Sequence, residues 1–238
     1  MTGKEAGGGP FQTGENWMPE GRKSQSSAPH FPAREEIERA LSERHTPEVQ
    51  RKLSAARAAV AGLGGLGSNI ALWLARLGVG HILLVDFDRV DLSNLNRQQY
   101  FLRHLGMEKT EAMTELLREV NPYLDVRAVC CRVTEENIPE LFREWDYILE
   151  AFDRPEEKAM LVNGILEHFP EKTLIAASGM AGIGRSKAIQ TRKISEHFYL
   201  CGDGCSESAP GAGLMAPRVA LCAAHQANLA AELIIERA

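Results

Sequence analysis

The sequence predicts an α/β fold of the Rossmann-like type, with a mostly parallel sheet, helices on both faces and an antiparallel C-terminal extension. Three observations carry this prediction. Short apolar runs alternate with helical stretches along most of the chain, which favours parallel strands joined by helices. Gly62, Gly64 and Gly67 form a G-x-G-x-x-G turn between the first apolar run and an apolar-striped helix. Asp86, 19 residues beyond Gly67, ends the next run.

Two helices are expected before the first strand. Residues 34–44 place Ile37 and Leu41 on one helical face. Thr-Pro-Glu at 46–48 begins a second helix, with a hydroxyl cap, a proline in the first turn and an acid near the positive end of the helix dipole. Residues 1–30 are rich in glycine, serine, proline and charge, so a disordered leader is expected there, followed by N-terminal helices over 31–57 and one domain over 58–238.

The alternation continues from the first strand toward the C-terminus. The predicted strands are 58–62, 81–86, 125–131, 147–150 and 173–177. The predicted helices are 68–77, 109–120, 135–145 and 155–168. Residues 188–192 and 196–200 are expected to form the more antiparallel region.

Composition argues against several classes of protein. A formal net charge of −5 over 238 residues argues against a nucleic-acid-binding surface. The chain has no apolar run of about 18 residues or more, so no membrane partner is expected. Five cysteines leave an odd one and form no disulfide framework, and no signal peptide is recognisable, which favours a cytoplasmic location.

The glycine turn and Asp86 point to a bound nucleotide. Glycines allow the backbone to approach phosphate closely, and a helix N-terminus offers free N–H groups to negative charge. Asp86 can accept hydrogen bonds from ribose hydroxyls, with a simple strand-end cap as the alternative. Taken alone, this half of the pattern would suggest an NAD-dependent oxidoreductase.

Residues 93–98, Ser-Asn-Leu-Asn-Arg-Gln, change that interpretation. Dinucleotide enzymes have no common need for such a polar cluster carrying an arginine, whereas an ATP-using enzyme must neutralise triphosphate charge. The ordered set Gly-Leu-Gly-Gly-Leu-Gly-Ser at 62–68, Asp-Phe-Asp at 86–88 and residues 93–98 resembles the ThiF/MoeB and ubiquitin-activating superfamily, and most closely its short bacterial ThiF type. The resemblance runs from about residue 41 to residue 236 and includes Gly-Met-Glu-Lys at 106–109, Glu-Ala-Phe-Asp at 150–153, Gly-Leu-Met-Ala-Pro at 213–217 and Gln-Ala at 226–227.

The resemblance implies a sulfur carrier protein adenylyltransferase. Such an enzyme uses ATP and Mg²⁺ to adenylate the C-terminal glycine carboxylate of a ThiS-like ubiquitin-fold sulfur carrier. A separate sulfur donor protein then completes sulfur transfer for thiamine thiazole synthesis. By this resemblance, residues 58–238 are the ATP-binding adenylyltransferase domain of a homodimer.

The resemblance also implies roles for individual residues. Arg97 and Lys109 would counter the polyphosphate, and Asp153 would help to place Mg²⁺. Lys109 at a helix start is poorly placed for the helix dipole, and a bound triphosphate would remove that objection. Arg44 is the candidate for an arginine supplied across the dimer interface. The expected nucleotide-binding set is Gly62, Gly64, Gly65, Gly67, Asp86, Asp88, Asn94, Arg97, Gln98 and Lys109.

Two departures from the family pattern leave alternatives open. The family has asparagine after the acid at Asp153, whereas Arg154 and a proline follow here, so a simple helix cap is the alternative for Asp153. Larger members hold zinc with two C-x-x-C pairs; here Cys201 and Cys205 are separated by three residues and only Cys222 follows, so no zinc site is expected.

The wider function also has rivals. The chain could activate a molybdopterin-type carrier, a small-molecule carboxylate or a tRNA-linked carboxylate. A non-catalytic scaffold that binds a ubiquitin-like protein is a further possibility. The sequence does not decide whether Cys201 or Cys205 takes part in sulfur transfer.

Overall fold

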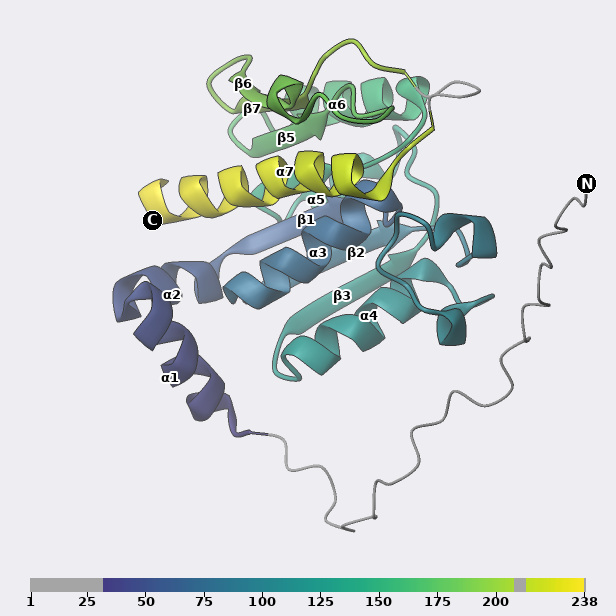
Figure 1. The fold of residues 1–238 in the computed structure, drawn as a ribbon. Coiled ribbons are helices and arrows are strands. Elements are labelled where there is room, and N and C mark those ends of the chain that lie inside the picture. The colour runs from purple at the N-terminus through teal and green to yellow at the C-terminus, as the bar shows by residue number, and fades with distance from the viewer. Residues whose placement is uncertain (1–31, 208–212, 238) are drawn as a thin grey trace, which may run out of the picture. The chain divides into compact units, whose positions relative to one another are not determined.

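Seven strands form one sheet in the part of the chain that the structure, a computed structural model, describes: residues 32–207 and 213–237 (Figure 1). The strand order is β3-β2-β1-β4-β5-β7-β6, and only the β6–β7 pair of this sheet is antiparallel. The predicted Rossmann-like fold is therefore confirmed. The expected leader over residues 1–30 lies outside the described residues. The strands are β1 (Arg57–Ala61), β2 (His81–Asp86), β3 (Asp125–Cys130), β4 (Tyr147–Glu150), β5 (Thr173–Ala177), β6 (Gln190–Lys193) and β7 (Phe198–Gly202).

Helices cover both faces of the sheet (Figure 1). Helices α2 (Pro47–Ala55), α3 (Gly65–Leu77), α4 (Lys109–Val120) and α7 (Ala216–Arg237) share one apolar core with the sheet, and α7 packs along α3. Helices α5 (Ile138–Phe142) and α6 (Pro155–His168) share the second core. Helix α1 (Arg34–His45) contacts α2 and buries no residue. None of the described helices has the length and apolar character of a membrane span.

Several predicted boundaries were wrong, and local contacts give the reason. Helix α3 begins at Gly65 rather than at residue 68, because the Ser68 amide already bonds to the Gly64 carbonyl. Helix α5 is shorter than the predicted 135–145, since the Asn137 side chain accepts from the Thr134 amide and closes a turn there. The strand expected at 188–192 begins at Gln190, because Ser186–Ala188 forms a 3₁₀ turn.

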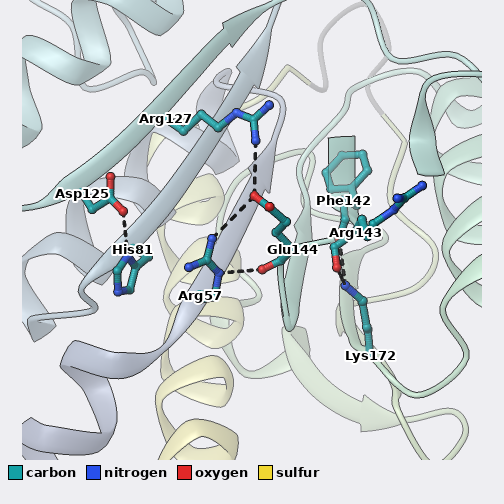
Figure 2. Close-up of polar contacts among 8 residues, drawn as sticks. All are labelled: Arg57, His81, Asp125, Arg127, Phe142, Arg143, Glu144 and Lys172. Atoms are coloured by element: carbon teal, nitrogen blue, oxygen red, sulfur yellow. Dashed lines mark hydrogen bonds and ion pairs between the residues drawn. The ribbon is translucent and has the colours of Figure 1, made fainter. Parts of the chain in front are cut away.

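At the amino ends of the first strands, charged side chains pair with one another (Figure 2). Arg57 donates from Nε to the Glu144 carbonyl at 2.7 Å, and its guanidinium lies 3.8 Å from the Glu144 carboxylate. Arg127 reaches the same carboxylate at 3.5 Å. His81 and Asp125, the first residues of β2 and β3, are 2.8 Å apart. These contacts join neighbouring strands away from the site described below.

Lys172, which lies outside helix α5, binds the C-terminal end of that helix in the same region (Figure 2). Its ammonium donates to the carbonyls of Phe142, at 2.9 Å, and of Arg143. The last carbonyls of a helix lack intrahelical partners, and a cation near them also favours the helix dipole. Lys172 therefore acts as a tertiary C-cap.

The strand order places a crevice at the other end of the sheet. Strand β1 pairs in parallel with β2 on one side and with β4 on the other, so the order reverses at β1. In open α/β sheets, ligands bind at the carboxyl ends of the strands where this reversal occurs.

Candidate functional site

A cavity of about 820 Å³ lies at the carboxyl ends of strands β1 to β5. This volume falls in the range of about 300–1,000 Å³ that is usual for small-molecule sites. The cavity brings together residues that lie far apart in the sequence. Of the residues predicted from the sequence, its lining includes Gly62, Gly64, Gly65, Asp86, Asp88, Asn94, Arg97, Gln98, Lys109 and Asp153.

Two predicted site residues are not among those that line the cavity. Gly67 lies inside α3, and a Cβ there would stand 1.7 Å from the Gly62 carbonyl oxygen. Its role is therefore close packing of the helix against the turn. Arg44 lies exposed on α1 and contributes nothing to this cavity within its own chain.

Two other segments approach the glycine turn so closely that side chains there would collide with them. Gly62 has φ of +93°, and a Cβ there would lie 2.9 Å from the carbonyl oxygen of Ala151, in the loop after β4. A Cβ at Gly65 would lie 2.9 Å from Val219 of α7. Helix α3 has no side-chain cap at Gly64, which suits a helix start that receives an anion.

Asp86 is held as a fixed acceptor at the end of β2. Its Oδ2 accepts from the Leu63 amide at 2.6 Å, and its Oδ1 accepts from the Asp88 amide at 2.7 Å. Burial raises the pKa of Asp86, while the charge of Lys109 and the two amide hydrogen bonds partly offset that effect. The carboxylate keeps lone pairs for a further donor, such as a ribose hydroxyl.

Lys109 and Asp88 form an ion pair at the cavity wall. The two side chains are 2.7 Å apart, and only 6% of the Lys109 side chain is exposed. The Lys109 amide also donates to the Asp88 carbonyl at 2.9 Å. The Asp88 carboxylate therefore balances a cation at the start of α4, which the sequence interpretation assigned to phosphate alone.

The segment after β2 contains unpaired buried polar atoms. Arg97 donates to the Asn96 side chain at 2.9 Å, but its Nε is buried and has no hydrogen-bond partner among the described residues. The same holds for Oε1 of Gln98, a residue that is only 8% exposed. Buried polar atoms are seldom left unpaired, so these two atoms mark a place where a ligand or water completes the bonding.

Asp153 lies exposed in the loop after β4 and faces the cavity. The alternative in which Asp153 caps a helix finds no support, because Arg154 is the N-cap residue of α6 and that helix has no side-chain cap bond. An exposed carboxylate at the carboxyl end of a strand is free to meet a cation that arrives with a ligand.

Sequence reasoning missed an arginine at the cavity wall. The Arg132 guanidinium lies 4.1 Å from the centroid of the Phe87 ring and 2.5 Å from the Glu157 carboxylate, and all three residues line the cavity. This contact joins the loop after β3 to α6. No local pattern announces such a pair, whose members are 25 residues apart.

A second missed pair fixes the loop that carries Cys205. Asp203 and Arg218 form an ion pair in which both side chains are almost fully buried. Asp203 Oδ1 also accepts from the amides of Cys205, at 3.0 Å, and Ser206, at 2.8 Å. Burial opposes the charge on Asp203, but these amide bonds, the Ser206 hydroxyl and Arg218 outweigh it and hold the pKa of Asp203 well below its usual range.

The cysteines differ sharply in access. Cys201 and Cys222 are buried, and burial raises the pKa of Cys201 to about 11 and that of Cys222 to about 12. Both are protonated thiols near neutral pH. Of the two cysteines that the sequence left open for sulfur transfer, Cys205 is the exposed one, and it lines the cavity. Within residues 32–207 and 213–237, no three His, Cys, Asp or Glu side chains are grouped to hold a metal ion.

Fold and cavity together define a Rossmann-like α/β class of protein with a cavity where the strand order of its sheet reverses. The model of the ThiF family matches residues 37–237, and the chain belongs to that family.

Named relatives in sequence match part of the chain. The molybdopterin-synthase adenylyltransferase of Haemophilus influenzae is 36% identical over 113 residues, which cover 47% of this chain and 46% of that protein. The adenylyltransferase and sulfurtransferase uba4 of Emericella nidulans is 36% identical over 137 residues, or 57% of this chain and 28% of that protein. The chain thus spans less than half the length of these curated relatives.

Solved structures share the fold. Escherichia coli tRNA N6-threonylcarbamoyladenosine dehydratase, TcdA, in complex with AMP has a TM-score of 0.75 at 24% identity, over 83% of this chain and 93% of that one. E. coli MccB with ATP has a TM-score of 0.64 at 21% identity, over 83% and 64% respectively.

Proposed function

We propose that the chain is an ATP-dependent adenylyltransferase that activates the C-terminal carboxylate of a ubiquitin-fold carrier protein. One observation supports this most strongly. A single cavity gathers a ribose acceptor, Asp86, two cations for polyphosphate, Arg97 and Lys109, and the exposed carboxylate of Asp153. The adenylyltransferase names of the matched relatives and the ATP in the TcdA and MccB structures agree with this choice.

The proposed reaction needs alignment rather than proton transfer. The carrier carboxylate is already ionised and attacks the α-phosphorus of MgATP. The bond from that phosphorus to the oxygen that bridges to the β-phosphate breaks, and pyrophosphate leaves. Positioned donors and cations stabilise the charge that develops, while binding supplies the alignment.

Asp153 fits a magnesium ion that arrives with the nucleotide. Mg²⁺ is usually held by one or two carboxylates together with substrate phosphates, rather than by a cage of protein ligands. A single exposed carboxylate facing the cavity suits that arrangement. In this proposal Arg97 and Lys109 hold the polyphosphate, and the glycine turn lets the backbone approach it.

The carrier in this proposal is ThiS-like, and the pathway is thiamine thiazole synthesis with a separate sulfur donor. The matched molybdopterin-synthase adenylyltransferase favours a molybdopterin-type carrier as the second candidate. Incubation of the protein with MgATP and each purified carrier, followed by mass spectrometry of the carrier, separates the two. We expect an AMP adduct on the ThiS-like carrier, and an adduct on the molybdopterin-type carrier alone would replace our choice.

The proposal includes a homodimer in which Arg44 of one subunit serves the cavity of the other. Its support is that Arg44 is exposed on α1 and does not line the cavity of its own chain. Subunit mixing tests it. An inactive Arg44→Ala protein should regain activity when mixed with an inactive Arg97→Ala protein, because one hybrid cavity then has both arginines.

A further inference from the structure

We propose that Glu150 is a positioning residue of the cavity, which fixes the loop carrying Asp153 through a network that includes Lys158. The inference rests on the proposed adenylation, since it assigns part of the machinery for that reaction. Neither residue was singled out by the sequence pattern as a site residue.

Glu150 is fully buried at the end of β4, yet each of its oxygens has two donors. Oε1 accepts from the Phe152 amide at 2.7 Å and from Lys158 Nζ at 2.9 Å. Oε2 accepts from Lys158 Nζ at 2.8 Å and from the Ala177 amide at 3.3 Å. Since replacing a buried ion pair by apolar groups often leaves stability unchanged, stability alone does not account for this network.

The network joins three elements where the cavity opens. Phe152 lies in the loop after β4, Ala177 ends β5, and Lys158 lies on α6. Gln226 of α7 also donates to the backbone carbonyls of Glu150, at 3.0 Å, and Ile175, at 3.1 Å. One carboxylate therefore sets how two neighbouring strands end.

The bond to the Phe152 amide bears directly on Asp153, the next residue. It fixes the direction in which the chain leaves β4, and hence where the Asp153 carboxylate meets the cavity. The Phe152 ring also lies close to the glycine turn, 3.0 Å from where a Cβ of Gly62 would be. A shift of this loop would disturb both sides of the cavity.

Lys158 is positioned to hold Glu150 rather than to bind phosphate. It lines the cavity with 21% of its side chain exposed, but its ammonium contacts both oxygens of Glu150. Glu150 is fully buried and holds Lys158 through both oxygens, whereas 49% of the side chain of Asp88, the partner of Lys109, is exposed. We therefore assign Lys158 to the network and leave the phosphates to Arg97 and Lys109.

The test uses Glu150→Gln, Lys158→Met and the double variant, with Glu144→Gln as a matched control at the amino ends of the sheet. The double variant removes both charges, so its melting temperature should return close to that of the wild type even if a single variant unfolds. In Glu150→Gln and in the double variant, hydrogen exchange at the Phe152 amide should rise by about tenfold or more, because the acceptor of this amide is weakened.

In the same variants the kcat for carrier adenylation should fall by about 10-fold to 100-fold while the KM for ATP changes little, since misplacement of the loop affects the reacting geometry. Glu144→Gln should leave the exchange at Phe152 and the kcat unchanged, and Lys158→Arg should recover part of the turnover.

Three results would overturn the inference. Wild-type kcat in the folded double variant would make the pair purely structural. A loss of ATP affinity in step with kcat would make Lys158 a nucleotide contact. Unchanged exchange at Phe152 would show that Glu150 does not fix the loop. If wild-type protein adenylates no carrier, the proposed function fails, while the exchange measurement still decides whether Glu150 holds the loop.

Discussion

The two ends of the same sheet are built differently. At the amino ends, Arg57 and Arg127 share the Glu144 carboxylate, and His81 faces Asp125. At the carboxyl ends, Arg97 Nε and Gln98 Oε1 are buried without a partner among the described residues. The charged groups named at the first end pair with one another. At the second end, the Arg97 and Gln98 atoms leave bonding capacity for a ligand, which is the expected signature of a functional site.

The comparison predicts that substitutions at the carboxyl end cost activity and that substitutions at the amino end cost stability. The largest effect is expected for Arg97→Ala, which should lower kcat/KM for adenylation by about 100-fold to 1,000-fold, as is typical when a charge-stabilising donor is removed. Its melting temperature should change little, because the Arg97 side chain donates to Ser93 and Asn96, which are near neighbours in its own loop. Arg127→Ala is the matched control at the other end. Equal losses of activity in the two variants would break the comparison.

Lys109→Met tests the residue at which stability and function overlap. We expect a loss of kcat/KM of about 100-fold. We also expect a loss of about 1–2 kcal/mol in the free energy of unfolding, reduced from the buried-pair value because 49% of the Asp88 side chain is exposed. Adding Asp88→Asn should restore stability, measured by urea unfolding, without restoring turnover. Recovery of both would show that Lys109 serves the fold alone.

At the amino end, Lys172→Met should destabilise the protein by about 1–2 kcal/mol through the loss of the bonds that cap α5. Turnover at saturating substrate should remain at the wild-type level. Chemical unfolding and steady-state kinetics on the same preparation measure the two effects. A clear fall in kcat without destabilisation would contradict the assignment of this end to stability.

The smallest effect concerns pH. The pKa of Asp86 is raised, so its carboxylate takes up a proton at a higher pH than an ordinary aspartate as the pH falls. Protonation removes a ribose acceptor, so ATP affinity should weaken as the pH falls through the raised pKa. For stability the sign is opposite, because a raised pKa favours the folded state at low pH and this contribution is lost as the pH rises through it. Calorimetric titration with ATP should show the dependence in the wild type and its loss in Asp86→Asn.

The sequence predicted those features that depend on residues close together in the chain. The parallel strands follow from short apolar runs, and the cavity follows from motifs that each occupy a strand end, such as the turn at Gly62 and the carboxylate of Asp86. The pairs Glu150–Lys158, Arg132–Glu157 and Asp203–Arg218 are set by tertiary packing between elements, so no local pattern contains them.

Helix boundaries failed for a related reason. The start of α5 depends on a side-chain bond from Asn137 to the Thr134 amide, whereas the apolar residues alone allow a longer helix. Polar contacts that compete with helix formation are difficult to weigh from apolar periodicity.

The most direct test of the account is pyrophosphate–ATP exchange in the presence of Mg²⁺ and a purified ThiS-like carrier, with a carrier that lacks its terminal glycine as the control. We predict exchange with the intact carrier alone, because the C-terminal carboxylate is the attacking group and adenylation is reversible. Measurable ATP binding without exchange on any ubiquitin-fold carrier would contradict the account and favour a small-molecule carboxylate as the substrate.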